Sequence, residues 1–422
     1  MKILFIIPGA GDSFYCGNCF RDNLQAAALR KAGYDVVIMP LYLPLKHESF
    51  HADTPLFFPA TTYYATQKLF SKGKMPKWME RLTSSDVMLR LAASMSGTTS
   101  AEGMEDMTIS MITGDDAAFQ NQVSKLTDWI KNHEKPDIIH LSSSLIIGIA
   151  KAIRQKMDIP IVCSLQDEEV WINTLNINYI NAAWKGITDN IHYINCFVTS
   201  SEFYKKIVLE KFSQIKEIEV IYPGVDTNKY LSSDYPQNPT IGFFYRMNRE
   251  NGLDILAEAF VILKKENCIP NLKLKIGGGY TGKDKGFLKK VKKILANFMD
   301  DVEICSNYSL DEHTSFYSSI SVISVPLTFD EGVGLYLCEA FAAGRPAVEP
   351  ATGSFPEIVG EGGILYQNNN SQELAQALKK LLTDKELYNI SKQKAKELSQ
   401  TRYNEQILSE KLVKLYKSFV TQ

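Results

Sequence analysis

Short apolar runs alternate with amphipathic helical patterns along almost the whole chain, and this alternation constrains the fold more than any other feature. Twelve of the apolar runs fit buried strands, in two series of six. The first series is 3–7, 36–39, 138–140, 161–164, 197–199 and 219–221, and the second is 241–244, 273–276, 302–305, 321–325, 347–348 and 363–365. Strands that alternate with helices form parallel sheets joined by right-handed crossovers. The sequence therefore predicts an α/β protein made of two doubly wound halves.

The helices that we expect between these strands complete the pattern: 18–31, 117–133, 144–156, 201–211, 252–266, 284–298, 310–318, 333–343, 371–382 and 385–399. A chain of 422 residues exceeds one comfortable hydrophobic core, so two domains are the natural expectation. Proline, aspartate, asparagine and serine are concentrated between 222 and 239, which indicates the join. We expect a first domain at 1–222, a second at 238–400, and a helix at 401–422 that packs back toward the first.

One region, 46–115, breaks the strand–helix rhythm with aromatic pairs, basic residues and small polar stretches. It is too long for a plain loop, and we expect a mostly helical insertion. Within it, 72–78 places three lysines beside Trp78. This segment is a candidate for peripheral contact with a membrane surface, against the alternative of a helix pair with a solvated basic face.

Composition excludes several classes of protein. A net charge of −2 and the lack of a long basic block argue against a general nucleic-acid binder. Seven cysteines, an odd number in a long chain, fit reduced thiols in a cytoplasm, and Cys16-Gly-Asn-Cys19 has no second pair at zinc-ligand spacing. The apolar run before Pro8 is too short for a secretion signal, and no run reaches the length of a membrane span. We therefore expect a cytoplasmic protein without a metal or other cofactor.

A motif at 329–344 places two glutamates, Glu331 and Glu339, eight residues apart with Gly332 and Gly334 between them. The apolar run before the motif and the helical pattern after it predict a strand, then a loop that carries Glu331, then a helix that begins close to Val333. The first amides of a helix have no partner within it and bind anions, and glycines let an anion approach the main chain. Glu339 lies about 9–12 Å further along the axis. A sugar, a diphosphate and a ribose fit this spacing, whereas the alternative for the motif alone is a pair of solvated glutamates.

Other residues at the carboxyl ends of expected strands add to this hypothesis. Gly17 lies between the first strand and the first helix, where its amide can approach a phosphate, and Asn18 lies in the first turn. Arg246 follows the strand at 241–244 and offers a fixed cation to a diphosphate, with a solvated arginine as the alternative. In open α/β sheets ligands bind beyond the carboxyl ends of the strands, so we expect the site in a cleft between the two halves.

Taken together, these residues resemble the family-4 retaining glycosyltransferases with the two-domain, Rossmann-like GT-B fold. The resemblance spans nearly the whole chain apart from 46–115. Its most specific part is the Glu331 to Gly344 motif, and the rest is supporting. Supporting segments are the turn at Gly17, Tyr34-Asp-Val, Pro223-Gly-Val-Asp226, Arg246, Gly252-Leu-Asp254, and Gly353 through Glu357-Ile-Val.

The resemblance implies a role for each site residue. Glu331 holds hydroxyls of the transferred sugar, and Glu339 holds the ribose. Arg246 and the amides of Val333, Gly334 and Leu335, with Gly332 beside them, hold the phosphates. The acceptor binds the first domain.

Two positions depart from the family's pattern. Asn251 stands where the family usually has a lysine that neutralises the departing diphosphate, and Gln166 stands where it often has a histidine. Arg249 is a candidate substitute for the missing lysine charge. Gln166 still donates a hydrogen bond to a sugar hydroxyl but carries no proton. These departures bear on the chemical step more than on donor binding.

The sequence thus predicts a hexosyltransferase-type enzyme that moves a sugar from a UDP- or GDP-sugar to an acceptor hydroxyl with retention and without a metal. Expected acceptors are glycans or lipid-linked molecules, in synthesis of cell-envelope or surface glycans. Glu331, Arg246 and Gln166 are the candidate catalytic residues. Two alternatives stay open: a catalytically silent protein of the same fold that binds a nucleotide-sugar, and a sugar-nucleotide epimerase or phosphorylase on the same architecture.

Overall fold

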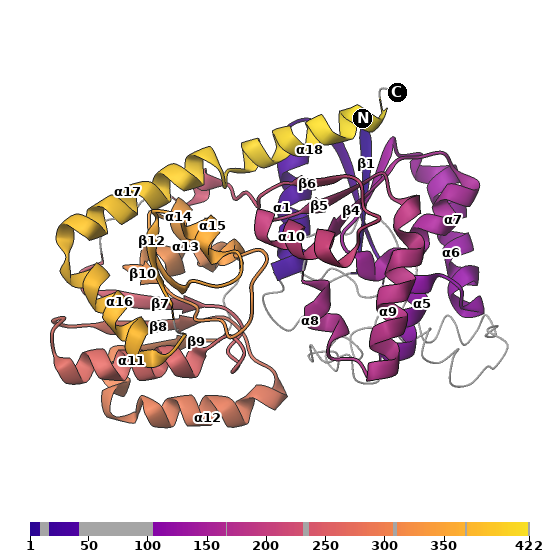
Figure 1. Cartoon of the computed structure of the whole chain (residues 1–422). Coiled ribbons are helices and arrows are strands. Elements are labelled where there is room, and N and C mark those ends of the chain that lie inside the picture. The colour runs from indigo at the N-terminus through magenta and orange to yellow at the C-terminus, as the bar shows by residue number, and fades with distance from the viewer. Residues whose placement is uncertain are drawn as a thin grey trace. The chain divides into compact units, whose positions relative to one another are not determined.

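A computed structural model describes residues 1–8, 17–41, 104–165, 167–230, 236–306, 310–367 and 369–420. The chain divides into two compact units. Unit 1 comprises Met1–Ser200, Lys205–Ile221 and Ser409–Gln422, and unit 2 comprises Ser201–Tyr204 and Tyr222–Leu408. Each unit contains one six-stranded sheet with helices packed around it (Figure 1). The predicted α/β fold with two doubly wound halves is confirmed.

The sheet of unit 1 is parallel throughout, in the order β2-β1-β3-β4-β5-β6. From β1 the chain adds β2 on one side of the sheet, and it then adds β3, β4, β5 and β6 in turn on the other side. The direction of winding therefore reverses between β1 and β3. Such a reversal marks the ligand-binding edge of an open sheet. The strands are β1 (Lys2–Ile7), β2 (Asp35–Pro40), β3 (Ile138–Leu141), β4 (Ile161–Leu165), β5 (Cys196–Thr199) and β6 (Ile218–Val220).

The helices of unit 1 fill the crossovers between these strands. They are α1 (Gly17–Lys31), α5 (Glu105–Thr113), α6 (Ala117–Trp129), α7 (Gly148–Lys156), α8 (Glu168–Ile172), α9 (Ile177–Asn190) and α10 (Glu202–Lys211), the first residues of which belong to unit 2. Short turns of other helix types are η1 (Ile130–Glu134), η2 (Ser144–Ile146) and η3 (Ile191–Tyr193). Most of the expected insertion at 46–115 lies outside the described residues, which include only its last part, with α5.

Helix α9 does not correspond to any predicted helix. Its sequence is rich in asparagine and β-branched residues, which have low helix propensity, so the local pattern is weak. Tertiary contacts stabilise it instead: Asn190 donates from Nδ2 to the carbonyl of Ile112 at 2.9 Å. A side chain at Gly186 would meet Ile112 at 2.8 Å, so the glycine permits close packing against α5.

The sheet of unit 2 is also parallel, in the order β12-β11-β10-β7-β8-β9, and its winding reverses between β7 and β10. The strands are β7 (Thr240–Phe244), β8 (Lys273–Gly277), β9 (Val302–Cys305), β10 (Val322–Ile323), β11 (Ala347–Pro350) and β12 (Gly363–Tyr366). Strand β10 is shorter than the predicted 321–325. The amide of Val325 is bound by the Glu349 carboxyl group at 3.1 Å and 3.2 Å, which ends the ladder.

The helices of unit 2 are α11 (Leu253–Glu266), α12 (Lys285–Ile294), α13 (Leu310–Ser318), α14 (Leu335–Ala342), α15 (Phe355–Val359), α16 (Ser371–Thr383), α17 (Lys385–Thr401) and the start of α18 (Glu405–Val420), whose later part belongs to unit 1. Short helical turns are η4 (Thr227–Lys229), η5 (Gly282–Asp284) and η6 (Ala296–Asp301). The core is formed by the strands and by the inner faces of these helices, with α14 buried along its whole length.

Candidate active site

Glu331 lies where the winding of the unit 2 sheet reverses, between the ends of β10 and β7. Its side chain is only 4% exposed. One carboxylate oxygen accepts from the amides of Val333 at 3.0 Å and Gly334 at 3.3 Å, and the other accepts from the Tyr245 hydroxyl at 3.2 Å. Burial raises the pKa of the carboxyl group, and the two amides and Tyr245 act against that rise. Glu331 is thus a buried hydrogen-bond acceptor, which excludes the alternative that it is solvated.

Two glycines make this arrangement possible. Gly334 precedes α14 with a φ of 60°, in the left-handed region that glycine adopts without strain. Helix α14 therefore begins at Leu335, two residues later than predicted. Gly353 has a φ of 57°, and a Cβ there would lie 2.6 Å from the backbone nitrogen of Glu331. The loop that carries Glu331 is fixed from both sides.

The predicted phosphate-binding amides are used differently from the expectation. Glu331 folds back and accepts from Val333 and Gly334, so in this structure these two amides serve the carboxylate and not a diphosphate. Gly332 accepts from the Ser201 hydroxyl at 2.8 Å through its carbonyl. The amides of Leu335 and Tyr336 lie in the first turn of α14, where a helix offers no acceptor to its own N–H groups. The N-terminal amides of α14, which have no acceptor within the helix, are therefore those of Leu335 and Tyr336.

Glu339 is fully buried and lies inside a cage of protein donors. Its two oxygens accept from the hydroxyls of Tyr230 at 2.7 Å and Tyr317 at 2.9 Å, and His313 Nδ1 lies 3.0 Å from the oxygen that Tyr230 contacts. A ribose hydroxyl would need one of these positions. In this structure the protein's own hydroxyls bind Glu339, so the predicted contact with ribose requires that ribose displace one of them.

Arg246, expected as a fixed cation for a diphosphate, is paired with an acid. Its Nη2 lies 3.0 Å from Oδ2 of Asp284 and 3.3 Å from the Thr281 hydroxyl. Burial raises the pKa of Asp284, but hydrogen bonds from the amide and hydroxyl of Thr281 and from Arg246 outweigh burial and hold it below its usual value. A diphosphate at Arg246 would have to compete with this carboxylate.

The two positions near Arg246 have different environments. Asn251 is 4% exposed and donates from Nδ2 to the carbonyl of Arg246 at 2.8 Å, which holds the loop after β7. It is therefore a structural residue in this structure and not an open donor-binding one. Arg249 is exposed, with its guanidinium 5.9 Å from the centre of the Phe287 ring. It remains the candidate replacement for the missing lysine charge.

The sequence analysis missed a second buried carboxyl group near Glu331. Glu349 is completely buried, and burial raises its pKa well above the usual value, with the negative charge of Glu331 adding to the rise. Tyr245, which contacts Glu331, was also missed. Both had a signal in the sequence: Glu349 is a charge inside the apolar run at 347–350, and Tyr245 directly precedes Arg246.

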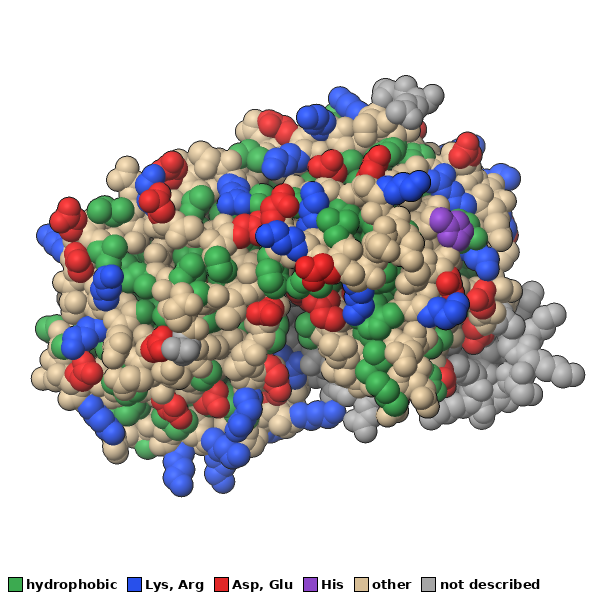
Figure 2. Space-filling view, in the orientation of Figure 1, with side chains coloured by type: hydrophobic (Ala, Val, Ile, Leu, Met, Phe, Trp, Pro, Cys, Tyr) green, Lys and Arg blue, Asp and Glu red, His purple; other side chains and the backbone are tan. Residues whose placement is uncertain are grey.

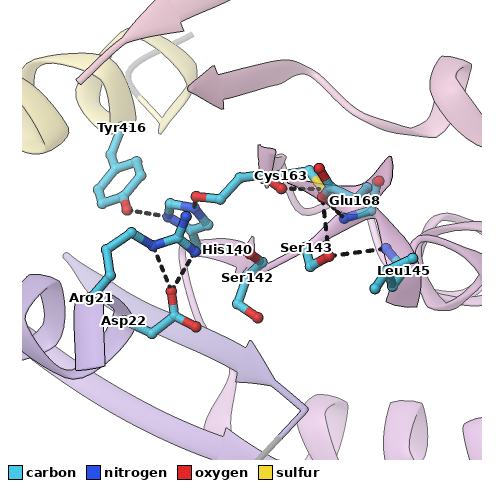
Figure 3. Close-up of polar contacts among 11 residues, drawn as sticks. Arg21, Asp22, His140, Ser142, Ser143, Leu145, Cys163, Glu168 and Tyr416 are labelled. Carbon is cyan, nitrogen blue, oxygen red and sulfur yellow. Dashed lines mark hydrogen bonds and ion pairs between the residues drawn. The ribbon is translucent and has the colours of Figure 1, made fainter. Parts of the chain in front are cut away.

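In unit 1, the predicted site residues Gly17, Asn18 and Gln166 lie at or next to the ends of the described ranges. Helix α1 begins at Gly17, one residue earlier than predicted, and Asn18 lies in its first turn, as expected. Gln166 lies outside the described residues. The carboxyl ends of β3 and β4 beside it hold a buried polar cluster that was not predicted (Figure 3).

Arg21 and Asp22 form the charged part of this cluster. Arg21 Nη2 contacts Oδ1 of Asp22 at 2.5 Å and donates to the carbonyl of Ser142 at 2.9 Å, and both side chains are nearly fully buried. Burial raises the pKa of Asp22, while Arg21 and Ser142 lower it. Glu168 lies on the other side of the serines and accepts from the hydroxyl of Ser143 at 3.0 Å (Figure 3).

His140 connects this cluster to the last helix of the chain. Nδ1 lies 2.5 Å from the hydroxyl of Tyr416 on α18, and Nε2 lies 2.8 Å from the hydroxyl of Ser164 (Figure 3). Burial, with a smaller effect of the Arg21 charge, lowers the pKa of His140 from 6.5 to about 3. The imidazole is therefore neutral near pH 7 and anchors α18 to unit 1.

Three further observations concern the described residues. No helix among them is both long and apolar enough to cross a bilayer. No group of three or more histidine, cysteine, aspartate or glutamate side chains in the described ranges is arranged to hold a metal ion. Five cysteines are free thiols: Cys163, Cys196, Cys268, Cys305 and Cys338.

Comparison with known proteins places both units in one class. Residues 117–229 match the family model described as Glycosyltransferase Family 4, and residues 238–384 match the model described as Glycosyl transferases group 1.

Among curated relatives, an uncharacterised glycosyltransferase of Methanocaldococcus jannaschii is 28% identical, covering 65% of this chain and 74% of that protein. D-inositol 3-phosphate glycosyltransferase of Corynebacterium aurimucosum is 26% identical, covering 40% of this chain and 43% of that protein. Sulfoquinovosyl transferase of Arabidopsis thaliana is 23% identical, covering 62% of this chain and 53% of that protein. The match thus spans about half the length of the latter two relatives.

Solved structures share the fold. Sucrose-phosphate synthase from Thermosynechococcus elongatus aligns with a TM-score of 0.72 at 15% identity, covering all of both chains. HepE of Anabaena, solved with UDP and glucose, aligns with a TM-score of 0.65 at 15% identity, covering 99% of this chain and 100% of that one. With the two parallel six-stranded sheets and the Glu331–Glu339 motif, these matches lead to one conclusion. The chain belongs to the family-4 glycosyltransferases with the GT-B fold.

Proposed function

We propose that this protein transfers a sugar from a UDP- or GDP-sugar to an acceptor hydroxyl with retention of configuration. The observation that carries the proposal is the Glu331 carboxylate, buried at the point where the unit 2 sheet reverses its winding and at the start of α14. There, a carboxylate that accepts hydrogen bonds from sugar hydroxyls lies beside helix amides that bind a phosphate.

Each residue has a task in this mechanism. Glu331 orients the transferred sugar, and the amides of Leu335 and Tyr336 bind the diphosphate with the help of the α14 dipole. Arg246 leaves Asp284 to pair with the diphosphate as negative charge develops on it. The ribose displaces the Tyr230 hydroxyl from Glu339.

The reaction needs no basic side chain at the sugar. The bond between the anomeric carbon and the donor phosphate oxygen breaks, and the acceptor oxygen bonds to that carbon on the same face. The acceptor proton moves to the departing phosphate oxygen. Charge on the leaving diphosphate is stabilised by Arg246 and the helix amides, so we propose that no metal is required.

The donor class is supported by the structural neighbours. Anabaena HepE, which has the same fold, was solved with UDP-glucose. For this chain we propose a UDP- or GDP-sugar, with the acceptor, a glycan or lipid-linked molecule, bound at unit 1. A role in cell-envelope or surface glycan synthesis in the cytoplasm is part of the proposal.

A panel of UDP- and GDP-sugars with soluble glycan and lipid-linked acceptors tests this function. The expected result is acceptor-dependent release of UDP or GDP, with the anomeric configuration of the donor kept in the product by NMR. An altered sugar with no acceptor present, or consumption of inorganic phosphate, would support a sugar-nucleotide epimerase or a phosphorylase instead. If no donor releases a nucleotide with any acceptor, the transferase proposal fails.

One alternative has a specific observation in its favour. A protein that binds a nucleotide-sugar without transferring it would not need the lysine that Asn251 replaces, and Arg246 is already neutralised by Asp284. Asn251→Lys would decide between the two. Turnover that appears only in this variant, and not in Asn251→Gln, would establish the silent protein.

A further inference from the structure

Helix α12 carries a dense row of lysines. Between residues 283 and 293 the chain has six lysines and a single acid, Asp284, which is paired with Arg246. All six lysines are exposed: Lys283, Lys285, Lys289, Lys290, Lys292 and Lys293. Figure 2 shows basic side chains gathered on the lower edge of the view, where Figure 1 places α12. The whole chain, by contrast, has a net charge of −2.

These lysines differ from others in the same unit. None of the six forms an ion pair with a described residue, whereas five lysines elsewhere in unit 2 each lie near a carboxylate. The five pairs are Lys264 with Asp301 at 2.7 Å, Lys273 with Asp301 at 2.6 Å, Lys275 with Glu303 at 3.2 Å, Lys379 with Glu266 at 2.8 Å and Lys394 with Glu397 at 3.1 Å.

The spacing of the lysines works against the isolated helix. Lys285, Lys289 and Lys293 follow each other at intervals of four, which places like charges next to one another on one face. Like-charge pairs at this spacing destabilise a helix. An anionic partner that lies along the face would remove this repulsion.

An open cavity of about 380 Å³ lies beside this face of α12. Its lining is mixed: three lysines of the row contribute to it, and apolar side chains from the sheet and α11 form much of the rest. The lining residues are Lys285, Lys289, Lys292, Leu288, Val291, Met247, Leu253, Ile276, Ile304, Tyr280 and Ser306. A partner that matches this lining has a negatively charged group next to an apolar body. Phospholipids have this combination, whereas a nucleic-acid backbone has no apolar body.

We propose that α12 is a docking surface for an anionic phospholipid membrane. The lysines contact the headgroup phosphates, with their long side chains reaching toward the membrane, and the cavity accepts an apolar part of one lipid. This surface is distinct from the segment at 72–78 that the sequence suggested. Glu331 is not among the residues that line this cavity.

Vesicle co-sedimentation of the full chain tests the proposal. We expect binding to phosphatidylcholine vesicles that contain about 30 mol % phosphatidylglycerol, and none to phosphatidylcholine alone. Binding should weaken when sodium chloride is raised from about 0.1 M to about 0.5 M, because salt screens the attraction. Failure to bind the anionic vesicles would overturn the proposal, as would binding to RNA but not to vesicles.

The triple variant Lys285→Gln/Lys289→Gln/Lys292→Gln locates the surface. Each lysine near an anionic membrane strengthens binding by about fivefold, so we expect the loss of three to lower the partition coefficient by about a hundredfold. Thermal melting of the variant checks that it is folded.

The matched control removes three exposed lysines of the same unit, Lys265, Lys385 and Lys396, by substitution with glutamine. We expect it to keep at least about a third of the wild-type partition coefficient, since only long-range charge is lost. Equal losses in the two variants would overturn the assignment to α12. UDP and GDP affinity, measured on both variants, should stay unchanged and thus separates this test from that of the proposed function.

Discussion

Two buried polar clusters, one in each unit, hold their charged groups in different ways. In unit 1, Arg21 is paired with Asp22, and His140 is neutral between two hydroxyls. In unit 2, Glu331 and Glu339 interact with backbone amides, tyrosine hydroxyls and a histidine. A carboxylate held by hydroxyls and amides can exchange them for the hydroxyls of a ligand at little cost, because no salt bridge is broken. We therefore interpret Arg21, Asp22 and His140 as structural and the unit 2 glutamates as a binding site.

The largest expected effect tests the structural half of this comparison. Asp22→Asn keeps the side-chain shape but leaves Arg21 as a buried, unneutralised charge. We expect the free energy of unfolding to fall by about 3–5 kcal/mol, measured by urea denaturation. Asp189→Asn, which breaks the exposed pair of Asp189 with Lys185, is the control and should cost less than about 1 kcal/mol. Equal effects would show that the buried pair is not important for stability.

The next largest effect tests whether the unit 2 glutamates form a binding site. Glu331→Gln keeps an oxygen that accepts from Val333 and Gly334, so the loop should stay folded. The loss of charge should weaken hydrogen bonds to the transferred sugar by about 1.5–3 kcal/mol, or roughly 10- to 150-fold in kcat/KM. The change in kcat/KM is measured by varying the donor concentration at a fixed acceptor concentration. Glu361→Gln, at an exposed glutamate of the same unit, should leave kcat/KM unchanged, and a similar rate for both variants would contradict the assignment.

A pH titration tests the neutral state of His140. Its pKa is about 3 in the folded protein and near 6.5 when unfolded, so below pH 6.5 the unfolded chain takes up a proton that the folded protein does not. Stability should therefore fall as pH drops from about 6.5 toward 3, by about 1.4 kcal/mol for each pH unit. His140→Gln should lose this part of the slope. An identical pH dependence in the variant would show that His140 is not responsible.

The smallest effect concerns the cage around Glu339. Tyr230→Phe removes one hydroxyl from the carboxylate and should destabilise the protein by about 1 kcal/mol. A ribose hydroxyl would then restore the lost bond, so nucleotide affinity should rise about fivefold. Tyr403→Phe, which removes a buried hydroxyl bonded to the carbonyl of Ile358, should destabilise the protein without raising affinity. Calorimetric titration that shows weaker or unchanged binding in Tyr230→Phe would exclude the exchange.

The sequence predicted the fold well because the parallel strands are continuous apolar runs between helical patterns. All twelve strands exist, with ends shifted by a few residues. The exception, the short β10, depends on a side chain distant in sequence, since Glu349 takes the amide of Val325. Helix α9 could not be predicted for a related reason, because its stability comes from packing against α5 and not from its own propensity.

The candidate site was predictable in its residues but not in their contacts. The motif predicted that Glu331 lies just before a helix. It could not show that the carboxylate accepts hydrogen bonds from the amides of Val333 and Gly334. The partners of Glu339 come from Tyr230 and from α13, and that of Arg246 from Asp284 before α12. These contacts connect residues 22 to 109 positions apart, which a local pattern does not specify.

Hydrogen–deuterium exchange with and without UDP- and GDP-sugars tests the central claim most directly. The account predicts slower exchange at the first-turn amides of α14, Leu335 and Tyr336, when the correct donor is added, and loss of that protection in Glu331→Gln. Protection confined to other segments, or no protection with any donor, would contradict it.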